Sequence, residues 1–172
     1  MRNLQLLISP DAIRQKIAAV ARAIDAQYAG EELTLIMVMK GAICIAADLM
    51  RALQTPCAIE YCSASSYGAR GTQRGELKIL GLDPLDLTDK HVLLVDDIFD
   101  SGTTLTQILL QLQAKNPKTL KSLVLLSKKV PRTTNYTPDY VLFEIENLFV
   151  IGFGLDYNEE YRGLPGIYSL ET

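Results

Sequence analysis

The sequence contains no tryptophan and a single histidine, His91. A lone histidine directly before an apolar run is more often a surface or boundary residue than a catalyst. Ser-His-Asp triads and Cys-His pairs are therefore poorly supported. Any chemistry that this chain performs must rest on carboxylates, lysines and backbone groups.

Cysteine is also scarce. Cys44, Cys57 and Cys62 are an odd number and sit among apolar neighbours. Four residues separate Cys57 from Cys62, but no further Cys or His nearby completes a zinc site. We expect reduced, mostly buried thiols, as in a cytoplasmic protein.

The chain lacks a basic excess, with 17 basic and 20 acidic side chains and a net charge of -3. This balance argues against a nucleic-acid partner. Apolar runs such as Leu33 to Met39 are too short to cross a bilayer, and the first five residues do not resemble a secretory signal. We expect no membrane partner and a single domain over residues 1–172.

Strands and helices alternate along the chain. Ser9 and Pro10 predict a helix start, and Gly30 its end. Further helices are predicted over Ala42 to Leu53 and Thr103 to Lys115, and strands over Leu33 to Met39, Pro56 to Cys62, Glu76 to Leu80, His91 to Val95, Leu120 to Leu126, Tyr140 to Phe143 and Phe149 to Gly152. This order predicts a parallel α/β sheet covered on both faces. Residues 63–75 have three glycines and no apolar periodicity, which predicts a mobile functional loop.

The strongest functional signal is VLLVDDIFDSGTTL, residues 92–105. Ligands of open α/β sheets bind beyond the carboxyl ends of strands, and a helix N-terminus suits a phosphate. Asp96 and Asp97 would repel that phosphate, so we expect them to face a ribose diol or a metal ion. An acid pair after a strand and a Ser-Gly-Thr-Thr helix cap are each common alone. Together they predict a ligand with a phosphate, a sugar diol and a metal-bound pyrophosphate.

The same run resembles the phosphoribosyl-pyrophosphate signature of type I phosphoribosyltransferases. The stretches MKGA (39–42), SSYG (65–68), LSKKVPR (126–132) and FVIGFGLDYNEEYR (149–162) resemble the hypoxanthine-guanine phosphoribosyltransferase family in its short bacterial form. The resemblance covers nearly the whole chain. It implies a parallel sheet flanked by helices, with a small hood or flap formed by terminal segments. It also implies a homodimer or homotetramer that uses magnesium in purine salvage.

The resemblance also implies roles for individual residues. Asp100 would be the general base that accepts the N7 proton of the purine as N9 attacks the sugar. The residues that would bind phosphoribosyl pyrophosphate are Lys40, Gly41, Asp96, Asp97, Asp100, Ser101, Gly102, Thr103, Thr104 and Arg162. Magnesium would interact with Asp96, Asp97 and Asp156. The family often has a non-proline cis peptide before its loop lysine, which predicts one at Met39-Lys40.

The remaining roles concern the purine base. Lys128 would donate to the purine O6 atom, which favours a 6-oxopurine over adenine. Lys129 is a rival, and the two lysines are otherwise a solvated pair. Phe149 would stack on the base, although a strand phenylalanine is more often a core residue. The other expected contacts are Val150 and Asp156 at the purine, and Ser66 and Tyr67 in loop closure.

Two alternatives remain open from the sequence. One is a phosphoribosyltransferase for xanthine or a pyrimidine. The other is a regulator on the same fold that senses phosphoribosyl pyrophosphate and binds nucleic acid. The Lys128 and Asp156 segments favour hypoxanthine and guanine over the first, and the lack of a basic excess argues against the second.

Overall fold

The computed structural model describes residues 4–67 and 76–170. Their elements are β1 (Leu4–Ile8), α1 (Pro10–Gln27), β2 (Leu33–Met39), α2 (Ile43–Ala52), β3 (Cys57–Tyr67), β4 (Glu76–Leu80), β5 (His91–Phe99), α3 (Thr103–Gln113), β6 (Thr119–Lys128), β7 (Tyr140–Ile145), β8 (Val150–Ile151) and β9 (Ile167–Leu170). None of the helices in these ranges is long and apolar enough to span a membrane.

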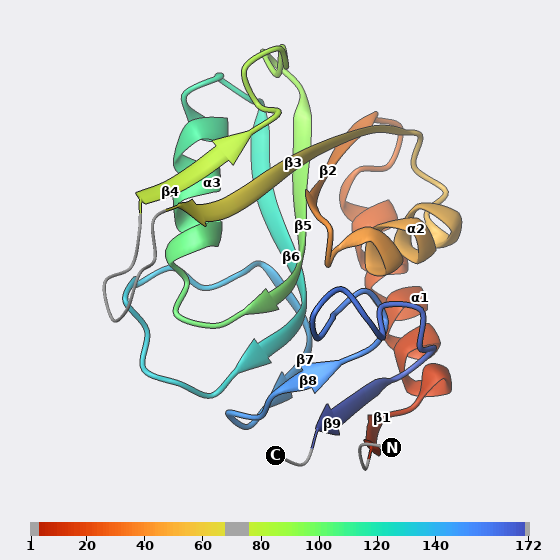
Figure 1. Cartoon of the computed structure of the whole chain (residues 1–172). Coiled ribbons are helices and arrows are strands. Elements are labelled where there is room, and N and C mark those ends of the chain that lie inside the picture. The colour runs from red at the N-terminus through yellow and green to blue at the C-terminus, as the bar shows by residue number, and fades with distance from the viewer. Residues whose placement is uncertain (1–3, 68–75, 171–172) are drawn as a thin grey trace.

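The larger sheet has six strands in the order β4-β3-β2-β5-β6-β7. Its neighbouring strands are parallel, except that β4 is antiparallel to β3. Helices α1 and α2 cover one face, and α3 covers the other (Figure 1). The predicted helix-flanked sheet is confirmed, with one antiparallel edge strand that makes it a mixed sheet.

Alternate residues of β5 face opposite sides of this sheet. Leu93 and Val95 join the core cluster beneath α1 and α2. Val92 and Leu94 join the cluster beneath α3. Because both faces are buried, the strand needs apolar side chains at successive positions, which explains the continuous apolar run in the sequence.

A second, three-stranded sheet has the order β1-β9-β8. The start of the chain in β1 pairs antiparallel with its end in β9, at the bottom of the view (Figure 1). The expected hood of terminal segments is therefore present. Neither β1 nor β9 was predicted as a strand, because the pairing joins distant segments and leaves little trace in local sequence.

The predicted loop over residues 63–75 is wrong in its first part. Strand β3 continues to Tyr67 and pairs antiparallel with β4, from Ser63 opposite Leu80 to Tyr67 opposite Glu76. Backbone hydrogen bonds to β4 extend β3 where small polar side chains show no periodicity. The rest of the predicted loop, residues 68–75, lies outside the described residues.

The predicted burial of the cysteines and of the single histidine is only partly right. Among the three thiols, which are all free, only Cys62 is fully buried, while Cys44 and Cys57 are half-buried. His91, expected at the surface or a boundary, is only 9% exposed. It lies at the start of β5, where its Nδ1 atom is 2.8 Å from Thr119 Oγ1.

Candidate functional site

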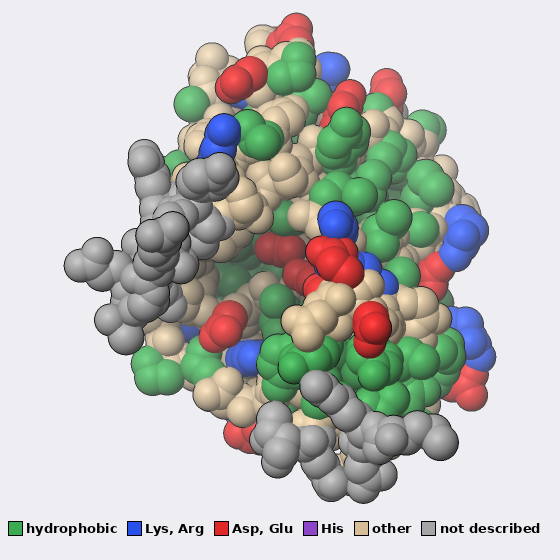
Figure 2. Space-filling view, viewed as in Figure 1, with side chains coloured by type: hydrophobic (Ala, Val, Ile, Leu, Met, Phe, Trp, Pro, Cys, Tyr) green, Lys and Arg blue, Asp and Glu red, His purple; other side chains and the backbone are tan. Residues whose placement is uncertain are grey.

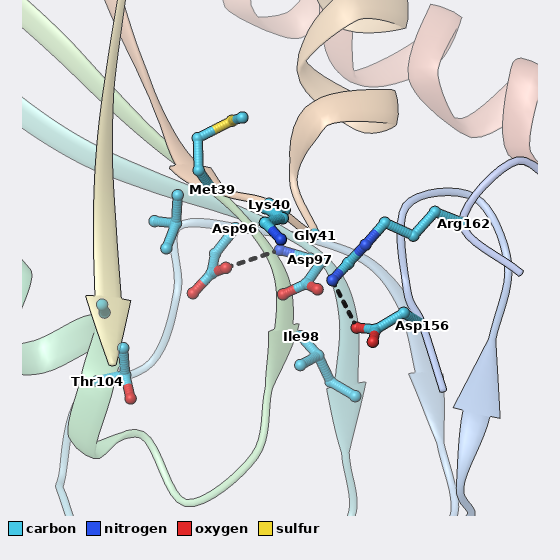
Figure 3. Close-up of a pocket in the computed structure, with 11 residues that line it drawn as sticks. Met39, Lys40, Gly41, Asp96, Asp97, Ile98, Thr104, Asp156 and Arg162 are labelled. Carbon is cyan, nitrogen blue, oxygen red and sulfur yellow. Dashed lines mark hydrogen bonds and ion pairs between the residues drawn. The ribbon is translucent and has the colours of Figure 1, made fainter. Parts of the chain in front are cut away.

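The order of the strands creates a crevice between β2 and β5. The connection from β2 runs through α2 to β3 on one side, whereas the connection from β5 runs through α3 to β6 on the other. Ligands of open α/β sheets bind at such a switch point, beyond the carboxyl ends of the strands. A cavity of about 270 Å³ lies there. It is lined by Val38, Met39, Lys40, Gly41, Ala64, Asp96, Asp97, Ile98, Thr104, Asp156 and Arg162 (Figure 3).

The acid pair Asp96 and Asp97 lies inside β5, because this strand continues to Phe99 and is longer than predicted. The Asp97 backbone N–H donates to Asp96 Oδ1 over 2.9 Å. Burial, and then the charge of Asp97, raises the pKa of Asp96 well above its usual value. Burial also raises the pKa of Asp97. Ionising both carboxyls here is costly, so hydroxyl donors or a cation would stabilise the charged pair.

Gly41 lets two segments approach this acid pair. A Cβ atom at Gly41 would overlap the Asp97 carboxylate, and one at Gly154 would overlap the Gly41 carbonyl oxygen. Gly154 also has φ +103°, which disfavours larger residues. The cis peptide predicted at Met39-Lys40 is confirmed and directly precedes this contact.

Two cationic side chains face the cavity beside the acid pair (Figure 3). Arg162 places Nη1 2.7 Å from the Gly154 carbonyl oxygen and Nη2 2.8 Å from Asp156 Oδ1. Lys40 Nζ is 2.9 Å from Glu159 Oε2. Acidic and basic side chains meet around a hollow near the centre of the face shown in Figure 2. The cavity therefore carries both signs of charge, as a ligand with a diol and a pyrophosphate requires.

The start of α3 forms a corner beside the cavity whose geometry suits an anion. Its N-cap is Gly102, with φ +90° and no side-chain hydrogen bond to the first turn. The N–H groups of that turn are free of a capping side chain, which suits a phosphate. A Cβ atom at Gly102 would also overlap Thr134 and press on the Phe99 ring. Thr104 lines the cavity itself, while Ser101 and Thr103 lie beside it, with their hydroxyl oxygens 3.2 Å apart.

Asp100 lies between β5 and α3 and is exposed. Within residues 4–67 and 76–170, no hydrogen bond or ion pair engages its carboxylate, whereas its carbonyl oxygen accepts from Arg132 Nη1. Nη1 also donates to the Phe99 carbonyl oxygen over 3.1 Å, and Nη2 donates to the Lys128 carbonyl oxygen over 2.6 Å. Arg132 thus ties the Asp100 loop to the end of β6.

The two candidate lysines differ in their partners. Lys129 Nζ lies 2.8 Å from Glu146 Oε1. This hydrogen bond is the main cause of the raised pKa of Lys129. In the part of the chain that is described, the Lys128 ammonium has no hydrogen bond or ion pair, although Lys128 is half-buried at the end of β6. Of the two lysines, Lys128 is therefore the one whose ammonium has no competing partner among the described residues.

Phe149 is 48% exposed, so it is not a core residue, as a phenylalanine in a strand more often is. Its ring packs edge-to-face against Tyr157, with centroids 5.7 Å apart. The neighbouring Val150 is buried in β8. Ser66 and Tyr67 end β3, opposite Leu77 and Glu76, but their side chains lie outside the described part of the structure.

Two residues in this region had no predicted role. Arg132 ends the stretch LSKKVPR, and Glu159 lies within the stretch that ends at Arg162. The only local signal for Arg132 was its position, four residues after the candidate Lys128. The partner of Glu159, Lys40, is 119 residues away, so no local pattern indicates their contact.

The donor groups fit magnesium if a ligand shares its coordination. Asp96, Asp97 and Asp156 line one cavity and offer the hard oxygen atoms that magnesium prefers. Within residues 4–67 and 76–170, however, no three His, Cys, Asp or Glu side chains gather closely enough to hold a metal alone. Asp156 already accepts from Arg162 and from the Glu159 backbone N–H.

The fold and this corner define a protein of the phosphoribosyltransferase class. The family model described as phosphoribosyl transferase domain matches residues 5–158. The chain is 37% identical to the hypoxanthine-guanine phosphoribosyltransferase of Aquifex aeolicus, over 99% of this chain and 96% of the relative. This protein therefore belongs to the hypoxanthine-guanine phosphoribosyltransferase family.

Solved structures agree with this assignment. The chain resembles a hypoxanthine-guanine phosphoribosyltransferase of Bacillus anthracis with a TM-score of 0.91 and 37% identity, over 99% of this chain and 100% of the other. It also resembles the Trypanosoma cruzi hypoxanthine phosphoribosyltransferase in complex with the product IMP. That match has a TM-score of 0.89 and 36% identity, over 99% of this chain and 95% of the other.

Proposed function

We propose that this protein transfers the 5-phosphoribosyl group from phosphoribosyl pyrophosphate to hypoxanthine and/or guanine, giving IMP or GMP and pyrophosphate. The observation that carries this proposal is one crevice that joins an acid pair, an uncapped helix N-terminus and two cations. The relatives named for the same reaction, or solved with its product IMP, support it.

The sugar donor would lie along this crevice with its 5′-phosphate at Ser101, Gly102, Thr103 and Thr104. This position is supported by the uncapped start of α3 and by the hydroxyl oxygens of Ser101 and Thr103, which lie 3.2 Å apart there. Asp96 and Asp97 would accept hydrogen bonds from the ribose hydroxyls. Lys40, the Gly41 backbone and Arg162 would bind the pyrophosphate, whose charge they partly neutralise as it departs.

The base would lie between the Asp100 loop and the ends of β6 and β8. Lys128 would donate to O6, Phe149 would stack on the ring, and Val150 and Asp156 would complete the contact. Asp100 would accept the N7 proton as N9 attacks the anomeric carbon. The free carboxylate of Asp100 and the unpaired ammonium of Lys128, both within the described residues, support these roles. Ser66 and Tyr67 would take part in closing the site.

Magnesium would be held by oxygens of the donor together with Asp96, Asp97 and Asp156, the last partly through water. When bound, it would supply positive charge to the pyrophosphate as the bond to the sugar breaks. A bound cation would also lower the raised pKa values of the acid pair, because it stabilises the ionised carboxylates.

Pyrophosphate release with a panel of bases tests this function. The purified protein is assayed with phosphoribosyl pyrophosphate, magnesium and hypoxanthine, guanine, xanthine, adenine or uracil, with a chelator as the control. We expect release with hypoxanthine or guanine, and loss of at least about 90% of it with the chelator, since the uncompensated pyrophosphate charge opposes binding. Preference for xanthine or uracil would contradict the proposed substrate class. Tight RNA binding without turnover would instead indicate a regulator.

We further propose that residues 1–172 form one domain, and that the protein is cytoplasmic and forms a homodimer or homotetramer. An apolar surface supports the assembly, because Ile43, Met50, Ile59 and Tyr61 are all at least 38% exposed. Figure 2 shows hydrophobic side chains gathered where Figure 1 places α2 and β3. Exposed apolar groups that cluster in this way often mark an interface between subunits.

A further inference from the structure

Glu159 bridges the two cations of the cavity with one oxygen atom. Its Oε2 is 2.9 Å from Lys40 Nζ and 3.4 Å from Arg162 Nη2. Lys40 follows β2, whereas Glu159 and Arg162 belong to the turn between β8 and β9. These hydrogen bonds, that of Lys40 first, hold the pKa of Glu159 below its usual value. The carboxylate is therefore an ionised partner of both cations.

Arg162 does not depend on Glu159 for its orientation. Its Nη1 donates to the Gly154 carbonyl oxygen and its Nη2 contacts Asp156, at 2.7 and 2.8 Å. Both partners lie in the same turn, so they would hold the guanidinium if Glu159 moved away. Lys40 differs, because among the residues that the structure describes its ammonium pairs with Glu159 alone.

The ion pair is open to water. The side chains of Lys40 and Glu159 are 61% and 65% exposed. An exposed pair of this kind contributes at most about 1 kcal/mol, so its partners exchange readily. A pyrophosphate carries more charge than one carboxylate and offers oxygens to both cations at once. It would therefore displace Glu159 from them.

We infer that Glu159 is an exchangeable counter-ion, which neutralises Lys40 and Arg162 when no pyrophosphate is bound and releases both to the pyrophosphate group of the donor or product. This inference rests on the proposed function and names a residue that tunes it. Competition from Glu159 weakens pyrophosphate binding and so speeds the departure of the product. Glu159 acts through the two cations and is not a catalytic residue.

The test is calorimetric binding of magnesium pyrophosphate to the full chain and to Glu159→Gln. We expect the variant to bind about two- to fivefold more tightly, which is the loss of a competing exposed ion pair. Glu160→Gln is the matched control, because Glu160 is exposed, carries the same charge and is the next residue. It should bind as the unsubstituted chain does. Glu159→Ala provides a second variant with the same expected gain.

Steady-state kinetics give an independent reading. Glu159→Gln should lower the KM for phosphoribosyl pyrophosphate without raising kcat, since it removes a competitor and not a group that acts on the reacting atoms. A merely structural role would weaken binding and not strengthen it.

The outcomes separate this inference from the proposed function. Weaker or unchanged binding by both Glu159 variants would show that Glu159 does not compete with pyrophosphate. If Glu160→Gln raised the affinity for magnesium pyrophosphate equally, the gain would come from the change in net charge alone. That result would also overturn the inference. If the unsubstituted chain bound no magnesium pyrophosphate, the proposed function would fail and this inference would fail with it.

Discussion

Asp100→Asn is expected to lower kcat by about 10²- to 10⁴-fold, the usual contribution of a general base. The amide keeps the size of the carboxylate but cannot accept the N7 proton of the purine. The structure supports this choice, because Arg132 holds the Asp100 loop through its backbone carbonyl, and the exposed carboxylate makes no hydrogen bond or ion pair with the described residues. Asparagine should therefore leave the loop in place.

The measurement is kcat and KM for hypoxanthine and for phosphoribosyl pyrophosphate. The KM values should change by less than about threefold, because the substitution leaves all the other proposed binding groups in place. Asp83→Asn is the control, since Asp83 is an exposed carboxylate that does not line the cavity. Turnover of Asp100→Asn within twofold of the unsubstituted protein would remove Asp100 from the proposed mechanism.

Lys128→Ala is expected to lower kcat/KM for hypoxanthine by about 10- to 100-fold. A hydrogen bond from a charged group contributes about 1.5–3 kcal/mol, and each 1.4 kcal/mol corresponds to a factor of ten. The ammonium of Lys128 has no competing partner in residues 4–67 and 76–170, so a carbonyl oxygen of the base can receive its full hydrogen bond. Its loss should also reduce the discrimination against adenine.

Lys129→Ala is the matched control, because it removes the same group at the next position. Lys129 is engaged by Glu146 at the surface, with 56% of its side chain exposed. Loss of such a pair should change kcat/KM by less than about threefold. If Lys129→Ala were the damaging substitution, the proposed assignment would be off by one residue.

The candidate site residues could be proposed from the sequence because most of them lie in continuous runs. Residues 92–105 contain the acid pair, Asp100 and the helix start in a single stretch, and the structure places that stretch at the strand-to-helix corner. The buried strands were readable too, because a parallel strand covered on both faces needs a run of apolar residues. The end of β5 was predicted too early in the sequence, because two successive acidic residues rarely occur inside a buried strand.

Contacts between distant segments could not be predicted from local sequence patterns. Local patterns did not predict β1 and β9 because each is completed by the other end of the chain. They also predicted a loop at Ser63–Tyr67, where pairing with β4 extends the strand. Arg132 and Glu159 went without roles because their partners, the Asp100 loop and Lys40, come from other elements.

The sequence by itself determined the alternation of strands and helices and the strand-to-helix corner that carries the acid pair. It could do so because periodicity and helix capping act over a few neighbouring residues. Only the tertiary structure decided that β2 and β5 are adjacent, that Gly41 meets Asp97, and that Lys128 and not Lys129 is unpaired among the described residues. These features depend on which distant surfaces pack together, and packing is decided by the whole fold.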